Sequence, residues 1–334
     1  MTGRPVDTVG ASTSVPARVP GSVRRTTSID MTMPGELTLT GRARDLLTAP
    51  DGTTTVLDSA SFDARVDDDG GQVIRAMSAT PSVDGLDTFV GRSASRGYRR
   101  ELGHIATEQG LVGGVLHQLL DDVPGAVLVS GYSPQLNQRG HGTGPAARAV
   151  VEARTHLMAG VCAGWQQGGV VMTSILDGAP PPIQVGPEAP SLAAPEDSRA
   201  WHELPGPMTP HGMRRLRRID VTAGPDAHAP LTVDAFFRDS YMTDGGVETI
   251  VHEYTLLVTV ERRGSMVLQS AATPRVLPFG QCPEAAASAG RLPGTTLDDL
   301  RTRIRTDFVG ATSCTHLNDA LRALEDVAAL ASHL

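Results

Sequence analysis

The chain has 334 residues and a formal net charge of −8, with 40% apolar and 20% charged residues. This is the composition of a globular protein long enough for about two domains. The acidic balance argues against sequence-independent nucleic-acid binding, which requires a clustered basic surface. No apolar run approaches the ~20 residues of a membrane span, so the sequence predicts neither a nucleic-acid partner nor a membrane partner.

Residues 1–22 are polar, and we expect them to be disordered. They contain no apolar stretch of the kind that forms a secretory signal. The chain has three cysteines, Cys162, Cys282 and Cys314, and this odd number does not suggest a disulfide framework. The sequence therefore predicts a cytoplasmic protein whose thiols are reduced.

An internal repeat organises the rest of the chain. The stretch RRTTSID (24–30) returns as RRLRRID (214–220), and the stretches at 42–48, 55–67 and 72–81 have counterparts at 236–242, 249–261 and 266–274. Four matches in the same order and in nearly the same register indicate a duplication. We expect the first copy at 23–168 and the second at 213–334, so that one chain imitates a homodimer.

Each copy begins with strands. Side chains of a strand alternate between its two faces, so every second residue of 250–260 is expected to face the core, with His252 among them. Glu253 points to the opposite face and is expected in solvent. In the first copy, the residues expected on the core face are Val56, Asp58, Ala60, Phe62, Ala64 and Val66.

Helices follow the strands. Residues 145–167 are predicted to form a helix that completes the first copy, and the proline-rich stretch 169–212 is predicted to be an extended linker. In the second copy, apolar residues at helical spacing predict two buried stripes, formed by Leu297, Leu300, Ile304 and Phe308 and by Leu317, Leu321, Leu324, Ala328 and Ala331. The predicted fold class is α+β, a tandem duplication of an antiparallel sheet with helices packed on one face.

Arginine-rich motifs occur in both copies. Arg-Arg-x-x-x-Ile-Asp opens each copy, and Arg44–Asp45 matches Arg238–Asp239. Motifs shared by both copies favour ion pairing within the sheet. The alternative is an anion site, because paired arginines offer bidentate donors to a phosphate or carboxylate.

Four residues of the second copy could hold a metal: His252, Cys282, Cys314 and His316. Cys282 follows the last strand, and Cys314 stands at the turn into the last helix, where the helix N-terminus would lower the pKa of its thiol. Thiolates and imidazoles are ligands of zinc, iron and iron–sulfur clusters. The alternative is that the cysteines are small buried hydrophobes and the histidines are hydrogen-bonded core or capping residues.

The repeat favours a site over a packing role. The first copy has Asp58 in place of His252 and no cysteine at the matching positions, whereas a packing requirement common to both copies would appear in both. His316 lies two residues beyond Cys314, about 200° around a regular helix, so both reach one ion only if the helix begins after them. Cys162 is expected in the core, from where it could also complete a site between the copies.

Part of the second copy resembles the NifU/IscU-type iron–sulfur scaffold fold, which SufE shares. The resemblance rests on Cys282, the stretch Ala285–Ala289, Gly294-Thr-Thr-Leu-Asp298, and Cys314 followed by Leu317. By this matching, the strand-borne aspartate of the scaffold falls on His252. Its first ligand cysteine falls on Ile250 and its ligand histidine on Ser313, so the resemblance implies two of the three scaffold cysteines.

The whole chain is similar to domain-of-unknown-function family 2889. The Arg-Arg-x-x-x-Ile-Asp starts and the Cys-Thr-His-Leu motif at Cys314–Leu317 are typical of that family. This resemblance implies a fold and supplies no activity.

Three functions are consistent with these residues. The first is a zinc or iron protein that uses His252, Cys282 and Cys314, with His316 or water as the fourth ligand; an open position would allow metal-assisted chemistry on a small molecule. The second is a metal-free enzyme with Cys314 as nucleophile and a histidine as base. The third is a non-catalytic binding or assembly module, in which the two copies form a groove for a partner.

Overall fold

The computed structural model describes residues 6–7, 9–33, 35–67, 71–133, 158–177, 179, 182, 184–263 and 265–334. Its strands are β1 (Val6–Asp7), β2 (Ser22–Thr32), β3 (Leu37–Thr48), β4 (Thr54–Val66), β5 (Ile74–Thr80), β6 (Met213–Thr222), β7 (Leu231–Met242), β8 (Glu248–Val260) and β9 (Val267–Leu277). Its α-helices are α1 (Tyr98–Glu108), α2 (Val115–Asp121), α3 (Val123–Ser130), α6 (Val170–Leu176), α7 (Leu300–Asp307), α8 (Thr315–Arg322) and α9 (Val327–Ala331).

Short 3-10 helices complete the described part of the chain: η1 (Leu86–Phe89), η2 (Ala163–Trp165), η3 (Cys282–Arg291), η4 (Leu297–Asp299), η5 (Gly310–Thr312) and η6 (Ala323–Asp326). Most of the helix predicted over 145–167 lies outside the described residues, and its described end, 158–167, contains η2. Within the described residues, we find no helix with the length and apolar character needed to cross a membrane.

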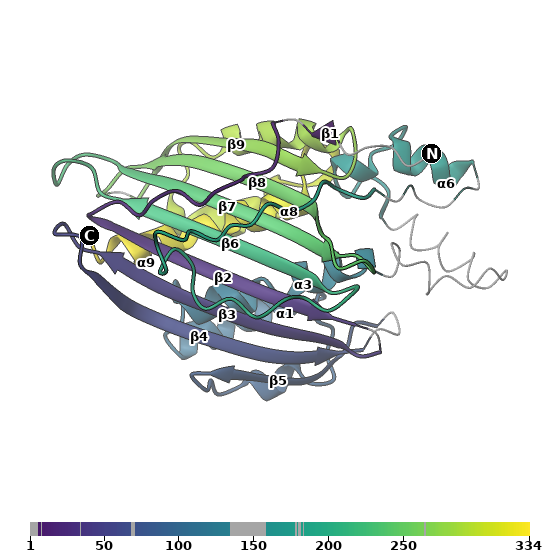
Figure 1. Ribbon diagram of the computed structural model, residues 1–334, viewed down its shortest axis with the longest axis horizontal. Coiled ribbons are helices and arrows are strands. Elements are labelled where there is room, and N and C mark those ends of the chain that lie inside the picture. Colours follow the sequence, from purple (N-terminus) through teal and green to yellow (C-terminus); the bar gives the residue numbers. More distant parts are fainter. Residues whose placement is uncertain are drawn as a thin grey trace.

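One antiparallel sheet runs through the molecule in the order β1-β9-β8-β7-β6-β2-β3-β4-β5. Helices α1, α3, α8 and α9 lie behind this sheet in Figure 1, whereas two irregular segments cross its front face. We call these segments the strap (residues 9–21) and the connector (residues 184–212). The prediction of a mixed α and β fold with a large antiparallel sheet is confirmed.

The two halves of the sheet meet at the pair β2–β6. These strands are antiparallel, and Thr27 lies opposite Arg217, its counterpart in the repeat. Strands β2–β5 and β6–β9 therefore run outward in the same order on either side of this point. A β-bulge also recurs at matching places: Leu57 is the extra residue of β4, opposite the step from Asp45 to Leu46, and Val251 is the extra residue of β8, opposite the step from Asp239 to Ser240.

The predicted burial is wrong at three strand positions, and the bulge accounts for the one that precedes it, Val56. A bulge inserts one extra residue, so it changes which side chains face the core. In β4 the residues from Ala60 onward alternate as predicted, but Val56 and Asp58 are exposed. In β8 the predicted core residues are buried, but Glu253 is fully buried as well. Its expected exposure is corrected, because the Arg238 guanidinium pairs with its carboxylate at 2.6 Å.

The helix face of the sheet carries the main apolar cores. The stripe Leu297, Leu300, Ile304 and Phe308 is buried as predicted, as are Leu317, Leu321 and Leu324. A second core, which includes Phe62, Leu102 and Leu119, covers the half formed by β2–β5. A glycine is required in β3, because a Cβ atom at Gly41 would overlap the Phe62 ring of β4.

Each Arg-Arg pair serves both faces of the sheet, because neighbouring residues of a strand point in opposite directions. Arg24 and Arg214 point to the front face, where they form reciprocal ion pairs across the β2–β6 junction. Arg24 binds Asp220 at 2.6 Å and Arg214 binds Asp30 at 2.6 Å. The predicted ion pairing within the sheet is confirmed.

The same front-face arginines hold the strap and the connector. Arg24 donates to the Pro16 carbonyl at 2.8 Å, and Arg214 donates to the Gly206 carbonyl at 2.7 Å. Arg238 donates to the carbonyls of Ser12 and Pro190, each at 2.9 Å. Residues 9–21, expected to be disordered, thus contact the sheet through charge-assisted hydrogen bonds, which are stronger than neutral ones.

His202 of the connector is buried on this face. Its Nδ1 lies 2.9 Å from Thr26 Oγ1 and its Nε2 lies 2.8 Å from Ser28 Oγ. Burial is the main cause that lowers the pKa of His202 to about 3, and the positive charge of Arg44 adds to it. The imidazole is therefore neutral at pH 7.

This depressed pKa predicts acid lability. An unfolded histidine titrates near pH 6.5, so protonation favours the unfolded chain, and the stabilising effect present above about pH 6.5 is lost as the pH falls toward about 3. The slope approaches about 1.4 kcal/mol per pH unit for one such histidine. Urea unfolding of His202→Asn between pH 7 and pH 4 should show a shallower pH dependence than the unaltered chain. The exposed His104→Asn serves as control, and equal slopes for all three proteins would contradict the assignment.

A candidate metal site beside a buried arginine network

Three residues from three elements meet on the helix face of the second half. Asp239 lies in β7 and His252 lies directly opposite it in β8, at the edge of the bulge. His316 belongs to the first turn of α8, whose N-cap residue is Cys314, two residues earlier. The ligand atoms of these three side chains all lie within 4.8 Å of one another. Within the described residues, no other group of three or more histidines, cysteines, aspartates or glutamates meets this distance.

The two imidazoles are stacked. Their ring centroids lie 3.6 Å apart with 17° between the planes, and His316 Nε2 lies 3.9 Å from Asp239 Oδ2. Burial is the main cause that lowers the pKa of both histidines. The pKa of His252 falls well below 6.5, and the neighbouring His316 adds to this shift. The pKa of His316 falls to about 3, and the positive charge of Arg215 adds to it. Both rings are therefore neutral at pH 7, which is the form that binds metals.

The donor set fits a transition-metal ion in part. His252 Nδ1 and His316 Nε2 are buried and have no hydrogen-bond partner among the described residues, although buried polar atoms are normally paired. Two imidazoles and a carboxylate suit zinc or iron. The parallel stacking, however, means that an ion in the plane of one ring lies outside the plane of the other, so binding would require one imidazole to rotate.

Asp239 is shared with Arg215. Both carboxylate oxygens accept guanidinium N–H groups, at 2.8 and 3.0 Å, and neither side chain is more than 1% exposed. This pair fixes the carboxylate beside the imidazoles, and it also places a positive charge where an ion would lie. An ion at this cluster would therefore compete with Arg215 for Asp239.

One of the three cysteine sulfur atoms borders this cluster. Cys314 Sγ is 4.0 Å from His316 Nδ1, so these two predicted residues are brought together. Cys282 lies further along the core, where a Cβ atom at Gly164 would be 3.0 Å from its sulfur and 3.9 Å from that of Cys162. Of the four predicted ligands, His252 and His316 join the cluster directly and Cys314 borders it.

Burial determines the chemistry of the thiols. It raises the pKa of Cys314, although the Tyr254 hydroxyl and the backbone amides of Leu317 and His316 lower it in part. The helix N-terminus therefore lowers the pKa of the Cys314 thiol in part, as expected. The predicted net lowering of this pKa is corrected, because desolvation is the larger effect. A buried thiol of raised pKa is a poor nucleophile, which disfavours the metal-free cysteine enzyme.

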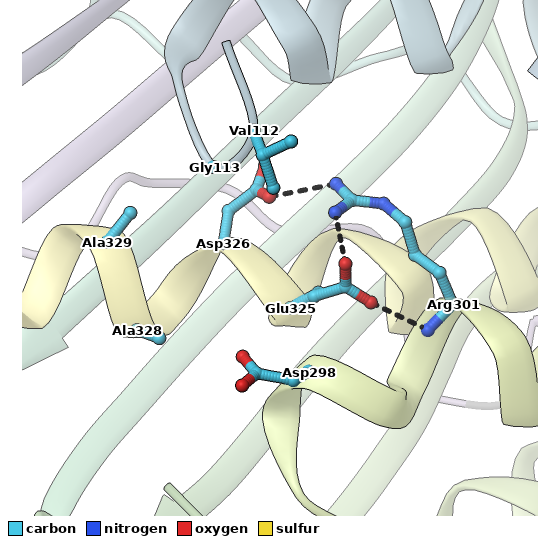
Figure 2. Close-up of a pocket in the computed structure, with 8 residues that line it drawn as sticks. All are labelled: Val112, Gly113, Asp298, Arg301, Glu325, Asp326, Ala328 and Ala329. Atoms are coloured by element: carbon cyan, nitrogen blue, oxygen red, sulfur yellow. Dashed lines mark hydrogen bonds and ion pairs between the residues drawn. The ribbon is translucent and has the colours of Figure 1, made fainter. Parts of the chain in front are cut away.

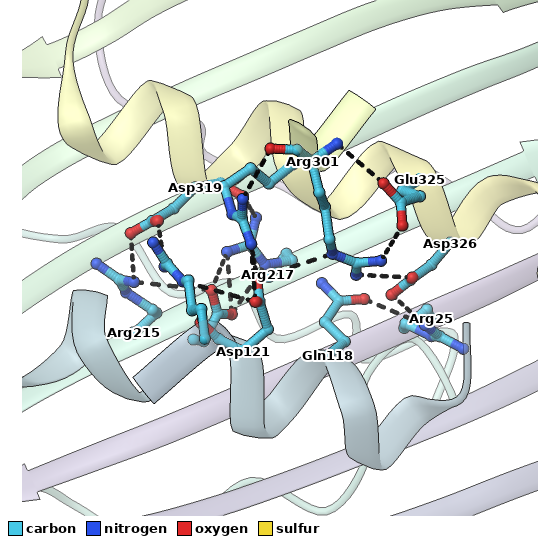
Figure 3. A network of polar contacts seen from close by, with 12 residues as sticks. Arg25, Gln118, Asp121, Arg215, Arg217, Arg301, Asp319, Glu325 and Asp326 are labelled. Atoms are coloured by element: carbon cyan, nitrogen blue, oxygen red, sulfur yellow. Dashed lines mark hydrogen bonds and ion pairs between the residues drawn. The ribbon is translucent and has the colours of Figure 1, made fainter. Parts of the chain in front are cut away.

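A network of buried arginines and carboxylates continues from Asp239 between the sheet and the helices (Figure 3). Its arginines are Arg25, Arg99, Arg215, Arg217, Arg301 and Arg322, and its carboxylates are Asp45, Asp121, Asp122, Asp239, Asp319, Glu325 and Asp326. Asp319 of α8 joins the two halves, because it accepts from Arg99 at 2.7 Å and from Arg215 at 3.1 Å.

The network repeats across the junction of the two halves. Arg25 pairs with Asp45 at 2.7 Å and with Asp326 at 2.9 Å. Its counterpart Arg215 pairs with Asp239, and it lies 3.8 Å from Asp122. Asp122 and Asp326 end the matching stretches Leu-Asp-Asp and Leu-Glu-Asp at 120–122 and 324–326. Each half thus supplies a helix carboxylate to the strand arginine of the other half.

The first half lacks the imidazoles. Asp58, the counterpart of His252, lies opposite Asp45 and is exposed. Val112 is the counterpart of His316, because it precedes Leu-Asp-Asp by the same number of residues as His316 precedes Leu-Glu-Asp. Val112 lines a cavity of about 320 Å³ together with Asp298, Arg301, Glu325 and Asp326. Figure 2 shows Arg301 between Glu325 and Asp326, to which it is bound at 2.8 Å each. The charge of Arg301 is thereby satisfied within the network.

Asp239 is the residue of the cluster that the sequence prediction missed as a ligand. In the sequence, Asp239 belongs to the Arg-Asp motif that occurs in both copies, and this motif indicates ion pairing. A signal was nevertheless present, because antiparallel pairing of 236–242 with 249–261 around a bulge would set Asp239 opposite His252.

Comparison with known proteins gives one match. The model of the family described as protein of unknown function (DUF2889) matches residues 213–330, which supports the resemblance to that family for the second half. The chain matches no curated protein and no solved structure. The resemblance to the NifU/IscU and SufE fold is therefore not confirmed.

Proposed function

We propose that the second half binds one divalent transition-metal ion, zinc or iron, through His252, His316 and Asp239, with Cys314 as the adjacent fourth donor. The observation that carries this proposal is the pair of buried imidazole nitrogens without hydrogen-bond partners beside one carboxylate. A bound ion would supply the partner that each nitrogen lacks. It would also join β7, β8 and α8, which meet at these residues.

A structural role for the ion is favoured over a catalytic one. His252 is 7% exposed and Cys314 is 4% exposed, and the cavity beside Arg301 is not lined by the cluster. Structural metal sites are closed by protein ligands, whereas catalytic sites keep a position open to water or substrate. Metal binding here would stabilise the contact between the last helix and the sheet.

The metal content of purified protein tests the proposal. Inductively coupled plasma mass spectrometry should find about one zinc or iron ion per chain in the unaltered protein and less than a fifth of that in His252→Gln and His316→Gln. His117→Gln is the matched control, because His117 is also buried and its Nδ1 has no partner among the described residues. Equal metal content in all four proteins, or none after reconstitution with either ion, would exclude the site.

Cobalt substitution distinguishes the sulfur ligands. A thiolate bound to Co²⁺ gives a near-ultraviolet charge-transfer band, and we expect this band to disappear in Cys314→Ser and to persist in Cys282→Ser. Loss of the band in both variants would instead favour the His252, Cys282 and Cys314 set that the sequence predicts.

A further inference from the structure

The front face of the second half contains a cavity of about 500 Å³, within the range of small-molecule sites. Its floor is formed by β7, β8 and β9, and its rim by strap residues 11–16 and by the connector residues Leu192 and Trp201. The cavity lies on the face opposite the helices, so it is separated from the metal cluster by the sheet.

One part of the lining of this cavity is apolar. Trp201 packs edge-on against Phe236, with ring centroids 6.2 Å apart, and Leu257 is 59% exposed although it lies in the middle of a strand. Exposed leucines are common singly, but one that lines a cavity with two aromatic rings indicates an apolar contact surface. This part of the cavity suits the hydrocarbon body of a ligand.

Two polar groups of the cavity have unused hydrogen-bonding capacity. Arg275 donates through Nε to Thr255 Oγ1 at 3.2 Å, and within the described residues it has no carboxylate partner. The other arginine of the lining, Arg218, is paired with Asp220 and Asp234. Trp201 is 7% exposed, and its buried indole N–H has no partner among the described residues. Of these two donors, Arg275 carries the charge, so it matches an acceptor that carries negative charge.

The fold by itself does not require an apolar groove here. Three neighbouring residues of β7, β8 and β9 have counterparts in β3, β4 and β5 by strand register. Phe236 corresponds to Arg42, Thr255 to Ser61 and Thr273 to Thr80. By the same register, Leu257 corresponds to Asp63, and Asp63 accepts a hydrogen bond from Thr40 at 2.9 Å. The first half thus has charged residues where the second half has Phe236 and Leu257, so the apolar part of the groove is a property of these two residues and not of the sheet.

We propose that this cavity binds a small monocarboxylate with an apolar body, whose carboxylate pairs with Arg275 and whose hydrocarbon part lies on Leu257, Phe236 and Trp201. The guanidinium supplies parallel N–H donors for bidentate recognition. The strap covers the bound ligand, since the Ser12 amide donates to Glu253 at 2.6 Å and the Ser12 carbonyl accepts from Arg238.

Tryptophan fluorescence gives a direct test. The chain has two tryptophans, so Trp165→Phe leaves Trp201 as the sole reporter in the lining of the cavity. Titration of this protein with decanoate should give a saturable, single-site change of fluorescence. Methyl decanoate, which has the same chain without the charge, should bind at least tenfold more weakly, because a hydrogen bond to a charged group is lost.

Variants at two positions, made in the Trp165→Phe background, locate the ligand. Arg275→Ala should weaken decanoate binding at least tenfold, while Arg275→Lys should retain part of it. Leu257→Asp, which introduces the residue of the matching position in the first half, should also weaken binding at least tenfold; because Leu257 is exposed, this change is compatible with folding. Arg42→Ala, on the same face of the first half, is the matched control and should bind decanoate within twofold of the parent.

Three results would overturn the proposal. They are the absence of saturable binding of decanoate, equal affinity for decanoate and its methyl ester, and unchanged affinity in folded Arg275→Ala and Leu257→Asp. Circular dichroism of each variant establishes folding before the titration.

Discussion

Replacing Arg25 with methionine should lower the free energy of unfolding by about 3–5 kcal/mol, as expected when one partner of a buried ion pair is removed. Arg25 is 1% exposed, and it donates to both oxygens of Asp45, to Asp326, to Gln118 and to the Gly113 carbonyl. Methionine fills much of the same volume but offers no donor. The Asp45 carboxylate then remains buried without its cation.

Denaturant unfolding at pH 7, followed by fluorescence and by circular dichroism, measures this loss. Arg65→Met is the control: Arg65 is 58% exposed and its ion pair with Glu36 spans 3.3 Å, so the change should cost less than about 1 kcal/mol. In the double variant Arg25→Met with Asp45→Asn, the loss should be smaller than in Arg25→Met alone, because the unpaired charge is gone. A loss below about 1 kcal/mol for Arg25→Met would contradict a stabilising role of the network.

Gly125→Ala should destabilise the protein by about 3 kcal/mol, although alanine is the better helix former. Gly125 lies in α3, where a Cβ atom would overlap Arg215 Nη1 and Asp319 Oδ2. The guanidinium cannot move aside without breaking its bidentate pair with Asp239, because Arg215 is fully buried. The expected loss combines overpacking with the separation of a buried ion pair.

Gly103→Ala provides the matched control. Gly103 lies in α1, and a Cβ atom there would meet no heavy atom within 4 Å. The same substitution should therefore stabilise the protein, by up to about 1 kcal/mol. Opposite signs for the two variants in thermal and urea unfolding would support the close approach of α3 to the network. A loss below about 1 kcal/mol for Gly125→Ala would argue against it.

The strands and the C-terminal helices were predictable because their signals are local. The alternation in 250–260 and the helical spacing of Leu297, Leu300, Ile304 and Phe308 depend only on neighbouring residues, and the structure confirms both. The exposure of Val56 and the burial of Glu253 were not predictable in this way. A bulge and an arginine from another strand decide them, and periodicity contains neither.

The candidate site was partly predictable for a related reason. Residue types present in one copy and absent from the other indicated His252 and His316, and these two rings are stacked in the structure. The remaining member, Asp239, could not be distinguished from its counterpart Asp45, since both belong to the same motif and both pair with an arginine.

The amino-acid sequence alone determined the repeat, the strand and helix positions that the structure confirms, and the acidic, arginine-rich character of the chain. Tertiary structure decided which of these residues meet. The two copies share one sheet through β2 and β6, and helices of each half supply carboxylates to the strand arginines of the other. Contacts such as Arg25–Asp326 join residues far apart in the chain, so no local pattern encodes them. They form because a buried charge must find an opposite charge wherever the packed elements bring one within reach.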